Sequence, residues 1–216
     1  MSSRDAILNR IRTHLADTPK PPPPATPEVW PRENPSPEQL FERFAAELAE
    51  VQGELIRCAS VEEARTKMAE LAVEVDWKRI GAVDCPACRE IAASVPSDRL
   101  EWDRADWPPQ DMAALDAGFV SADWLLADTG SCVVECNTPA QRLMCFLPPV
   151  CIVVARTEQL FEHLPTAWPQ IAAKTAEADR RGEHVIVTGP SRTADIEKIL
   201  ILGVHGPKRL IVLLVG

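Results

Sequence analysis

The stretch His184–Val215, HVIVTGPSRTADIEKILILGVHGPKRLIVLLV, decides the fold class of this chain. It begins with a short apolar run, His184 to Val187, which Gly189-Pro190 ends, and such a run is typical of a buried strand. Thr193 is expected to cap a helix that runs to Leu200, and Leu210–Val215 indicates a second buried strand. Strand, tight turn, helix and strand make a right-handed parallel crossover, so we predict an α/β domain with helices on both faces of the sheet.

The turn inside this stretch has the composition of an anion-binding site. Thr188–Thr193 offers the backbone N–H of Gly189, the hydroxyls of Ser191 and Thr193, and the guanidinium of Arg192. These groups are expected at a helix N-terminus, beyond the carboxyl end of a strand, where α/β sheets bind ligands. The alternative is an ordinary strand-to-helix turn with capping side chains. The turn is neither a Walker loop nor a G-x-G-x-x-G fingerprint, so no cofactor is predicted in this chain.

Composition narrows the class of protein. The 216 residues carry a net charge of −9, which argues against a nucleic-acid or anionic-membrane surface. The longest weakly polar run, Leu143–Ala155, is interrupted by Pro148-Pro149 and is too short to span a bilayer. The first 15 residues scatter charges among apolar positions, unlike a signal peptide. Seven cysteines without such a signal indicate reduced thiols, and we expect a cytoplasmic protein.

Three segments are expected along the chain. Residues 1–18 are expected to form an amphipathic helix with an apolar stripe at Ile7, Leu8, Ile11 and Leu15. Residues 19–37 contain 9 prolines and form an extended linker. Residues 38–216 form the α/β domain. The N-terminal helix either packs on its own domain or docks on a partner or a second copy, so a homo-oligomer is compatible with the sequence.

Helical and strand patterns alternate within the domain, as a doubly wound sheet requires. The expected elements are a helix over Pro37–Val51, a strand over Leu55–Cys58, a helix opened by the capping box Ser60-x-x-Glu63, a strand over Ile80–Val83, a helix near Asp111–Asp116, a hairpin of Trp124–Ala127 and Cys132–Cys136, a strand over Cys151–Ala155, and a helix over Thr157–Arg181 interrupted by Pro165 and Pro169.

The predicted hairpin carries the candidate acids. Its tip, Asp128-Thr129-Gly130-Ser131, places a carboxylate and two hydroxyls together, and Glu135 follows on the next strand. Asp-Thr-Gly is also the aspartic-protease triplet, but that chemistry needs two such carboxylates and only one is present. Asp128 and Glu135 are weak catalytic candidates, Glu135 as a nucleophilic carboxylate. The alternative for Glu135 is a solvated sheet face.

Two further motifs are ambiguous. Cys85-Pro86-Ala87-Cys88 follows a strand and opens a helix, which is the context of a thioredoxin-like redox pair, but core packing also explains it. A zinc site would need a second ligand pair, so no metal is expected. His205 lies between Gly203 and Gly206. It could act as an acid or base, but its loop precedes the last strand and is expected opposite the ligand turn, which favours a structural role.

Taken together, these motifs resemble the lactate-utilisation protein C family, whose members carry the LUD domain. The residues that carry the resemblance are the C-terminal stretch 188–210, the pair Ala122-Asp123 with Asp128–Ser131, and Leu147–Val150. The resemblance extends over essentially the whole chain, including the N-terminal helix and linker. Cys136–Arg142 replaces a Gly-containing stretch of the family, although Arg142 itself is kept, and Asp128 stands where the family usually has Glu.

The resemblance implies both a fold and a role. The fold would be an open three-layer α/β sandwich with a mostly parallel sheet, similar to the ribose-phosphate isomerase and CoA-transferase group. The role would be a non-cluster subunit of a system that oxidises L-lactate to pyruvate with two iron–sulfur proteins. In that role the chain would bind a small anionic metabolite. The predicted ligand residues are Thr129, Gly130, Ser131, Arg142, Gly189, Ser191, Arg192 and Thr193.

Two other hypotheses stay open. The chain could be a stand-alone transferase or ligase that uses Asp128 or Glu135 as the working carboxylate. It could also be a scaffold or regulatory protein whose N-terminal helix grips a partner.

Overall fold

A computed structural model of the chain describes residues 3–16, 30, 32–177, 183–194 and 200–216. The chain divides into two compact units, residues 1–31 and 32–216. In the first unit, helix α1 (Ser3–Ala16) forms as predicted and buries none of its residues. Most of the predicted linker lies outside the described residues. The second unit holds all three sheets of the described residues and all the candidate site residues.

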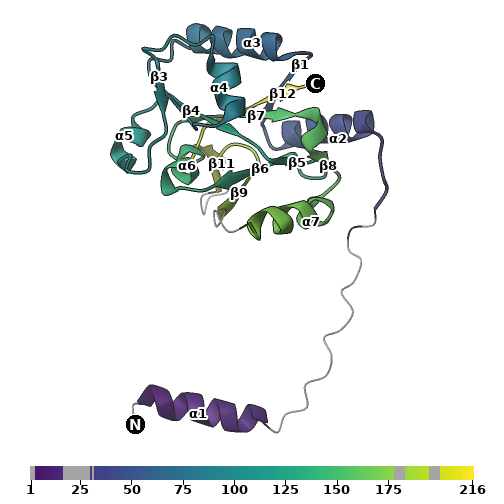
Figure 1. Cartoon of the computed structure of the whole chain (residues 1–216), viewed down its shortest axis with the longest axis vertical. Helices are drawn as coiled ribbons and strands as arrows, with labels where there is room; N and C mark the ends of the chain where they lie inside the picture. The colour runs from purple at the N-terminus through teal and green to yellow at the C-terminus, as the bar shows by residue number, and fades with distance from the viewer. Residues whose placement is uncertain (1–2, 17–29, 31, 178–182, 195–199) are drawn as a thin grey trace. The chain divides into compact units, whose positions relative to one another are not determined.

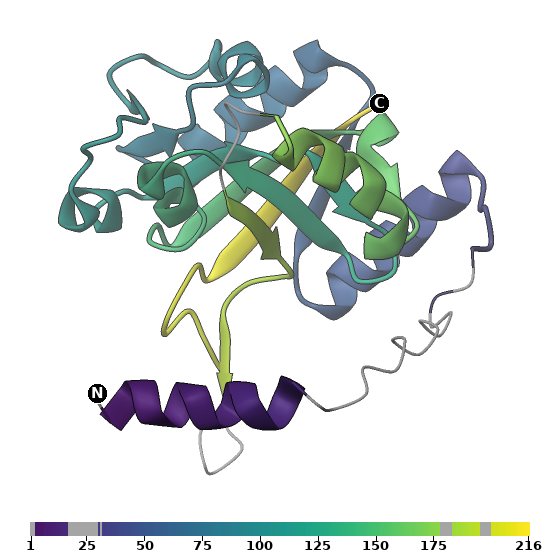
Figure 2. The same cartoon turned by 60° about the horizontal axis from the view of Figure 1, so that its bottom comes forward.

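The centre of the second unit is a six-stranded, all-parallel sheet. From one edge to the other it consists of β1 (Glu54–Cys58), β12 (Arg209–Val215), β7 (Val150–Arg156), β4 (Ala117–Ser121), β2 (Ile80–Ala82) and β3 (Leu100–Trp102). The central strands β7 and β12 are apolar along almost their whole length because both faces are covered. Figure 2 shows β12, in yellow, running through the middle of the domain.

A smaller sheet covers part of one face of the large sheet. Its strands are β8 (Leu160–Phe161), β5 (Trp124–Leu126), β6 (Ser131–Cys136) and β9 (Glu183–Val187), in that order. β5 and β6 form the predicted antiparallel hairpin, and β9 pairs antiparallel with β6. The inward residues Cys132 and Val134 join the main core, whereas the outward Val133 packs under α7.

The helices fill the remaining layers. They are α2 (Pro37–Glu50), α3 (Val61–Glu74), α4 (Pro86–Ala92), α5 (Pro109–Ala113), α6 (Pro139–Met144) and α7 (Leu164–Thr175), with a short 3₁₀ turn, η1 (Thr157–Gln159). Ser36 caps α2 in a capping box with Gln39, and Ser60 caps α3 as predicted. Figure 1 shows α3 and α4 on one side of the large sheet and the small sheet with α7 on the other. The predicted α/β fold with a mostly parallel sheet flanked by helices is confirmed.

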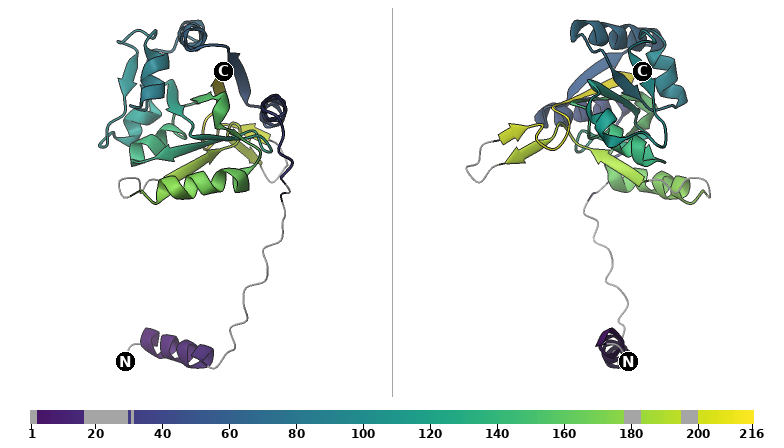
Figure 3. Two further views of the ribbon diagram at one scale, coloured as in Figure 1. Left: turned by 45° about the vertical axis from the view of Figure 1, so that its right-hand side comes forward. Right: turned by 90° about the vertical axis from the view of Figure 1, so that its left-hand side faces the viewer.

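The crossover predicted from the C-terminal stretch is wrong. Where a helix was expected from Thr193, the chain forms two antiparallel strands, β10 (Arg192–Ala194) and β11 (Leu200–Leu202). Residues 195–199 lie outside the described part of the chain. The strands that flank this hairpin are also not neighbours, because β9 belongs to the small sheet and β12 to the large one. In Figure 3 the hairpin extends from the body of the domain.

The helix predicted over Thr157–Arg181 is also corrected. The segment begins with η1 and the short strand β8, and the helix α7 starts only at Leu164. Pro165 lies in the first turn, where a missing N–H costs nothing, and Pro169 lies inside the helix.

The strand order places a topological switch point between β2 and β4. The chain runs from β2 outward to β3 at the edge, then returns past β2 to β4 and on toward β7. After β2 it enters α4 on one face, and after β4 it enters the small sheet on the other face (Figure 1). Ligands of open α/β sheets bind beyond the carboxyl ends of strands at such a point. The residues there are Asp84 and Cys85 after β2, and Ala122 and Asp123 after β4.

Candidate functional site

A chain of hydroxyl groups links the tip of the β5–β6 hairpin to the end of β9. Ser131, which is buried, donates from Oγ to Thr129 Oγ1 over 2.8 Å, and Thr129 Oγ1 donates to Asp128 Oδ1 over 3.3 Å. The Ser131 hydroxyl also lies 2.7 Å from Thr188 Oγ1. Because a hydroxyl has one hydrogen to donate, Thr188 must donate to Ser131. The chain therefore ends on the Asp128 carboxylate.

The two predicted ligand glycines are explained by close packing on α2. Gly130 has φ +61°, and a Cβ there would lie 2.3 Å from the backbone nitrogen of Leu48. Gly189 has φ +76°, and a Cβ there would lie 2.5 Å from the carbonyl oxygen of Val51. Only glycine combines this backbone conformation with such an approach. Both residues therefore fix the hairpin tip and the following turn to the C-terminal end of α2.

The turn after β9 contacts the loop that carries His205. The Ser191 N–H donates to the Pro207 carbonyl, and the Gly203 N–H donates to the Ser191 carbonyl, each over 2.8 Å. The prediction that the His205 loop lies opposite this turn is therefore wrong. Both segments lie at the amino end of β12, because β9 is not a strand of the parallel sheet. The turn also lacks the helix N-terminus on which its anion-site prediction rested.

Arg142 is separated from the other predicted ligand residues. Its guanidinium, on α6, forms an ion pair with Glu183 at 2.8 Å, and Glu183 is paired with Cys136 at the far end of β6. The hairpin tip is at the other end of that strand, roughly 17 Å away for six residues. Of the remaining predicted ligand residues, Thr129, Gly130 and Ser131 lie at the hairpin tip beside Thr188. Gly189, Ser191, Arg192 and Thr193 follow Thr188 along the chain into β10, and Ser191 contacts the His205 loop.

A second polar cluster lies between the small sheet and α7, at the carboxyl end of β4. Lys174 Nζ lies 2.5 Å from Asp123 Oδ1 and 2.8 Å from Glu135 Oε2. The other Asp123 oxygen accepts the backbone N–H of Glu135 over 2.8 Å. The Glu135 side chain is only 5% exposed, so it is not the solvated face that the sequence allowed as an alternative.

Electrostatics keep the lysine of this cluster charged. Burial alone would lower the pKa of Lys174, but hydrogen bonds to Asp123 and Glu135, together with their negative charges, raise the pKa above its ordinary value. The Lys174 ammonium also lies 5.1 Å from the centre of the Trp124 ring.

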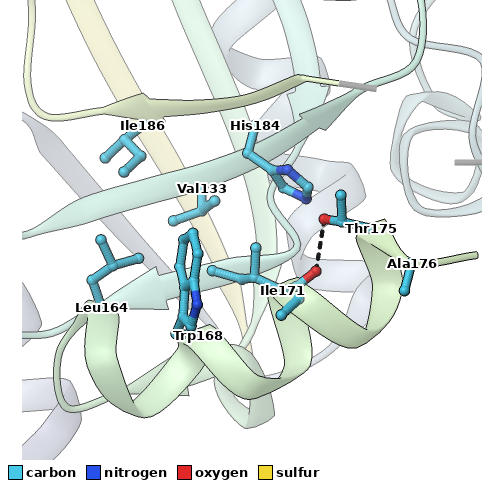
Figure 4. Close-up of a pocket in the computed structure, with 9 residues that line it drawn as sticks. Val133, Leu164, Trp168, Ile171, Thr175, Ala176, His184 and Ile186 are labelled. Carbon is cyan, nitrogen blue, oxygen red and sulfur yellow. Dashed lines mark hydrogen bonds between the residues drawn. The ribbon is translucent and has the colours of Figure 1, made fainter. Parts of the chain in front are cut away.

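An open groove of about 610 Å³ lies beside this cluster, between α7 and β9. Figure 4 shows Trp168 and Ile171 of α7 facing Ile186 and His184 of β9 across it. Trp168 and Ile186 are 57% and 48% exposed, which is unusual for side chains of this size. The Nε2 atom of His184 is buried and has no hydrogen-bond partner among the residues that the structure describes. The groove therefore suits a largely apolar ligand.

The sequence missed three members of this second region: Asp123, Lys174 and His184. Asp123 follows a strand of the parallel sheet, and that position is a usable signal once β4 is recognised. Lys174 and His184 reach the cluster only through the packing of α7 and β9, which no local pattern reveals. Among the described residues, no group of three or more His, Cys, Asp and Glu side chains is placed to hold a metal ion. No helix in the described ranges has the length and apolar character needed to cross a membrane.

The fold and these two polar regions define an α/β protein built on a six-stranded parallel sheet, and comparison with known proteins identifies its family. Residues 41–215 match the LUD domain, so the chain belongs to the LUD domain family. A lactate utilization protein C from Exiguobacterium is 26% identical over all of this chain and 96% of its own length. Another, from Halalkalibacterium halodurans, is 32% identical over 44% of this chain.

Several of the matches are partial. The chain covers 45% of an uncharacterized protein from Neisseria meningitidis, at 29% identity, and 41% of the Halalkalibacterium halodurans protein. Among solved structures, a DUF162 family protein from Deinococcus radiodurans superposes with a TM-score of 0.63 at 17% identity, over 84% of this chain and 99% of the other. At this identity the likeness concerns the fold.

Proposed function

We propose that this protein takes part in L-lactate utilisation, as a subunit of a system that oxidises L-lactate to pyruvate. The observation that carries this is the LUD domain match over residues 41–215, together with relatives named lactate utilization protein C, one of which aligns along the whole chain. In this proposal two iron–sulfur partner proteins carry the electrons. This chain would then supply ligand binding or assembly.

Growth and purification from the source organism test this role. Deleting the gene should abolish growth on L-lactate as sole carbon source and spare growth on pyruvate, because only the oxidation step is lost. A tagged copy should restore growth and bring down two iron–sulfur proteins together with lactate-oxidising activity. Normal growth of the deletion strain on L-lactate would contradict the role, and isolation of the tagged protein alone would contradict the partners.

The ligand would be a small anion held near the hairpin tip and the turn after β9. Arg192 is exposed there, so its guanidinium is available to a carboxylate or phosphate, whereas the Thr129 and Thr188 hydroxyls already donate their hydrogens to Asp128 and Ser131. The hydroxyl chain that ends on Asp128 keeps the tip ordered before binding. Arg142 is left out of this site because Glu183 already holds its guanidinium at the far end of β6.

Calorimetric titration with L-lactate, pyruvate and inorganic phosphate tests the site. Arg192→Ala should weaken binding of the preferred anion by 10-fold or more, since a hydrogen bond to a charged group contributes about 1.5–3 kcal/mol. The matched control is Arg104→Ala, which removes an exposed arginine that stacks on Trp107 near β3. If the wild-type protein and Arg192→Ala bound the anion with equal affinity, the proposed anion site would be wrong.

A stand-alone transferase or ligase is the second candidate function, and the position of Glu135 favours it. Its carboxylate is held by Lys174 beside the 610 Å³ groove. Attack on an acyl-CoA thioester would form a mixed anhydride on Glu135 and release the CoA thiolate. Trapping with hydroxylamine should convert Glu135 to a hydroxamate that mass spectrometry detects. Glu101→Gln is the control and Glu135→Gln should abolish the product. No adduct across a broad acyl-CoA panel would exclude this function.

A further inference from the structure

The seven cysteines fall into two environments. Cys85 is half-buried, whereas Cys88 and the other five are buried. All seven lie in the described part of the chain. Burial raises the pKa of Cys132, and that of Cys151 to about 12, so these thiols are inert at neutral pH. Cys85 is therefore the thiol that solvent can reach.

The backbone places Cys85 and Cys88 at the start of one helix. Cys85 is the residue that precedes α4, with φ −134° and ψ 160°, and Cys88 is the third residue of the helix. Side chains at these two positions approach each other, as in a capping box. Their Cα atoms are separated by one helical turn, roughly 5 to 6 Å, which is within the range that a disulfide spans. Closing the bridge therefore needs no movement of α4.

The electrostatics of the two thiols differ in the direction that thiol exchange requires. The Cys88 thiol and then the backbone N–H groups of Cys88 and Ala87 lower the pKa of Cys85 to about 7, against the effect of burial and of Asp123. The interaction with Cys85, together with burial, raises the pKa of Cys88 well above its ordinary value. At neutral pH one thiol is thus substantially ionised and the other is protonated.

Three aspartates lie near the two thiols. Asp123 faces Cys85, while Asp84 and Asp103 face the buried thiol. Asp84 is paired with Arg89, whose Nε lies 2.5 Å from Oδ1. Asp123 is likewise paired with Lys174, whereas Asp103 has no ion-pair partner among the described residues. This one unneutralised carboxylate lets a neutral or cationic disulfide approach Cys85 more readily than an anionic one.

We propose that Cys85 and Cys88 form a thiol–disulfide exchange site, with Cys85 as the attacking thiol and Cys88 as the resolving thiol. The half-buried position of Cys85, the one-turn spacing and the burial of Cys88 carry this assignment. The co-substrate is a low-molecular-weight disulfide of neutral or positive charge. Because Cys88 is shielded from solvent, only Cys85 can react with it first, and only the mixed disulfide on Cys85 is close enough for Cys88 to attack.

The exchange balances in two steps. The Cys85 thiolate attacks one sulfur of the small disulfide, forms a mixed disulfide and releases the first small thiolate, which takes up a proton. Cys88 then loses its proton to solvent and attacks the Cys85 sulfur, which forms the Cys85–Cys88 bond and releases the second small thiol. Two protein thiols are oxidised and one small disulfide is reduced to two thiols.

Reaction of the reduced, full-length protein with cystamine, a cationic disulfide, tests the assignment. Wild-type protein should release two equivalents of cysteamine and gain a Cys85–Cys88 disulfide, which peptide mass spectrometry identifies as a loss of two mass units. The rate should rise with a midpoint near pH 7. Oxidised glutathione, which is anionic, should react at least several-fold more slowly.

Two variants separate the roles of the thiols. Cys88→Ala should react at Cys85 but stop at the mixed disulfide, with one equivalent of cysteamine released, and Cys85→Ser should lose the fast reaction. A wild-type protein that stops at a stable mixed disulfide, or a rate midpoint near pH 9, would overturn the assignment. Because these two measurements use the wild-type chain, they hold even if Cys88→Ala, which changes a fully buried side chain, folds poorly.

Discussion

At the scale of single residues, the ion cluster under α7 is where burial and charge conflict. Glu135 is 5% exposed, and Asp123 and Lys174 are about one-quarter exposed. Removing a charge from water costs several kcal/mol, and only a close partner compensates it. The three charged side chains therefore stabilise the fold only together. Replacing one of them leaves the others buried without a partner, which lowers the free energy of unfolding.

Lys174→Met should destabilise the protein by about 3 kcal/mol or more, because two neighbouring carboxylates lose their counter-ion. Urea unfolding at pH 7 measures this, with Lys67→Met as the control, since that exposed lysine pairs with Glu70 on α3 and should cost under about 0.5 kcal/mol. The folded pKa of Lys174 is raised, so its contribution should be present below its ordinary value of 10.5 and fade as the pH rises through the raised pKa. Equal effects of the two substitutions would show that the cluster is not coupled.

The two positive-φ glycines near the hairpin and the last loop offer a second test. Gly130→Ala should cost roughly 2–4 kcal/mol, since the new Cβ would meet the backbone of Leu48 as well as adopt a left-handed conformation. Gly203→Ala has a similar φ of +73°, but its Cβ would mainly meet the flexible Lys208 side chain, so the loss should stay near 1 kcal/mol. Thermal unfolding compares them, and a smaller loss for Gly130→Ala would contradict the α2 contact.

At this scale the sequence predicted which residues carry polar chemistry, but it did not predict which residues they contact. It predicted the hydroxyl-rich tip of Thr129 and Ser131, and the structure confirms that these side chains lie together with Thr188. It assigned Gly130 to a ligand because composition cannot show that α2, some 80 residues earlier, packs on it. The role of Lys174 could not be predicted for the same reason, since its partners Asp123 and Glu135 lie in other parts of the chain.

At the scale of elements, capping and strand patterns were sufficient where local rules decide the structure. The helix start at Ser60 and the Trp124–Ala127 hairpin strand were predicted close to their observed bounds, although the Glu63 side chain accepts the N–H of Ala59 and does not close the expected capping box. The helix prediction after Thr193 was wrong because Leu200–Leu202 pairs with Arg192–Ala194 in a local hairpin, and a short apolar run does not distinguish a strand from a piece of helix. Interruption of the helix by Pro169 was expected, and α7 tolerates it.

Pro169 lies inside α7 and is exposed, so it lacks a backbone donor without gaining burial. Pro169→Ala should raise the free energy of unfolding by about 1–3 kcal/mol, because the i to i−4 hydrogen bond to Pro165 can then form. Pro165→Ala is the matched control. It lies in the first helical turn and should change stability by less than about 0.5 kcal/mol, or lower it. Guanidinium unfolding measures both, and equal shifts would mean that the helix ladder at Pro169 is not the cause.

At the scale of the whole molecule, the sequence predicted the fold class but not the topology. The parallel neighbours of β12 are β1 and β7, which are distant in sequence, and no pattern in the C-terminal stretch names them. Because the strand order was unknown, the ligand turn was also predicted at the wrong end of the sheet. The switch point between β2 and β4 became recognisable only with the strand order, and it brings Cys85 near Asp123.

The N-terminal helix is the part of the molecule whose role the domain does not explain. Its exposed stripe, Ile7, Ile11 and Leu15, is 48–59% exposed, and α1 buries none of its residues. Because residues 1–31 form a compact unit of their own, deleting them should leave the free energy of unfolding of residues 32–216 within about 0.5 kcal/mol of the full chain. A larger loss in urea unfolding would mean that the helix packs on its own domain.

The same deletion separates a scaffold role from a purely ligand-binding one. If α1 grips a partner, a tagged chain lacking residues 1–31 should no longer bring down the proteins that the full chain recovers from lactate-grown cells, while its affinity for small anions stays unchanged. Replacing Ile7, Ile11 and Leu15 together by serine in the full chain should reproduce that loss, because the apolar stripe would supply the contact area. Recovery of the same partners by both variants would place the interaction on the α/β domain instead.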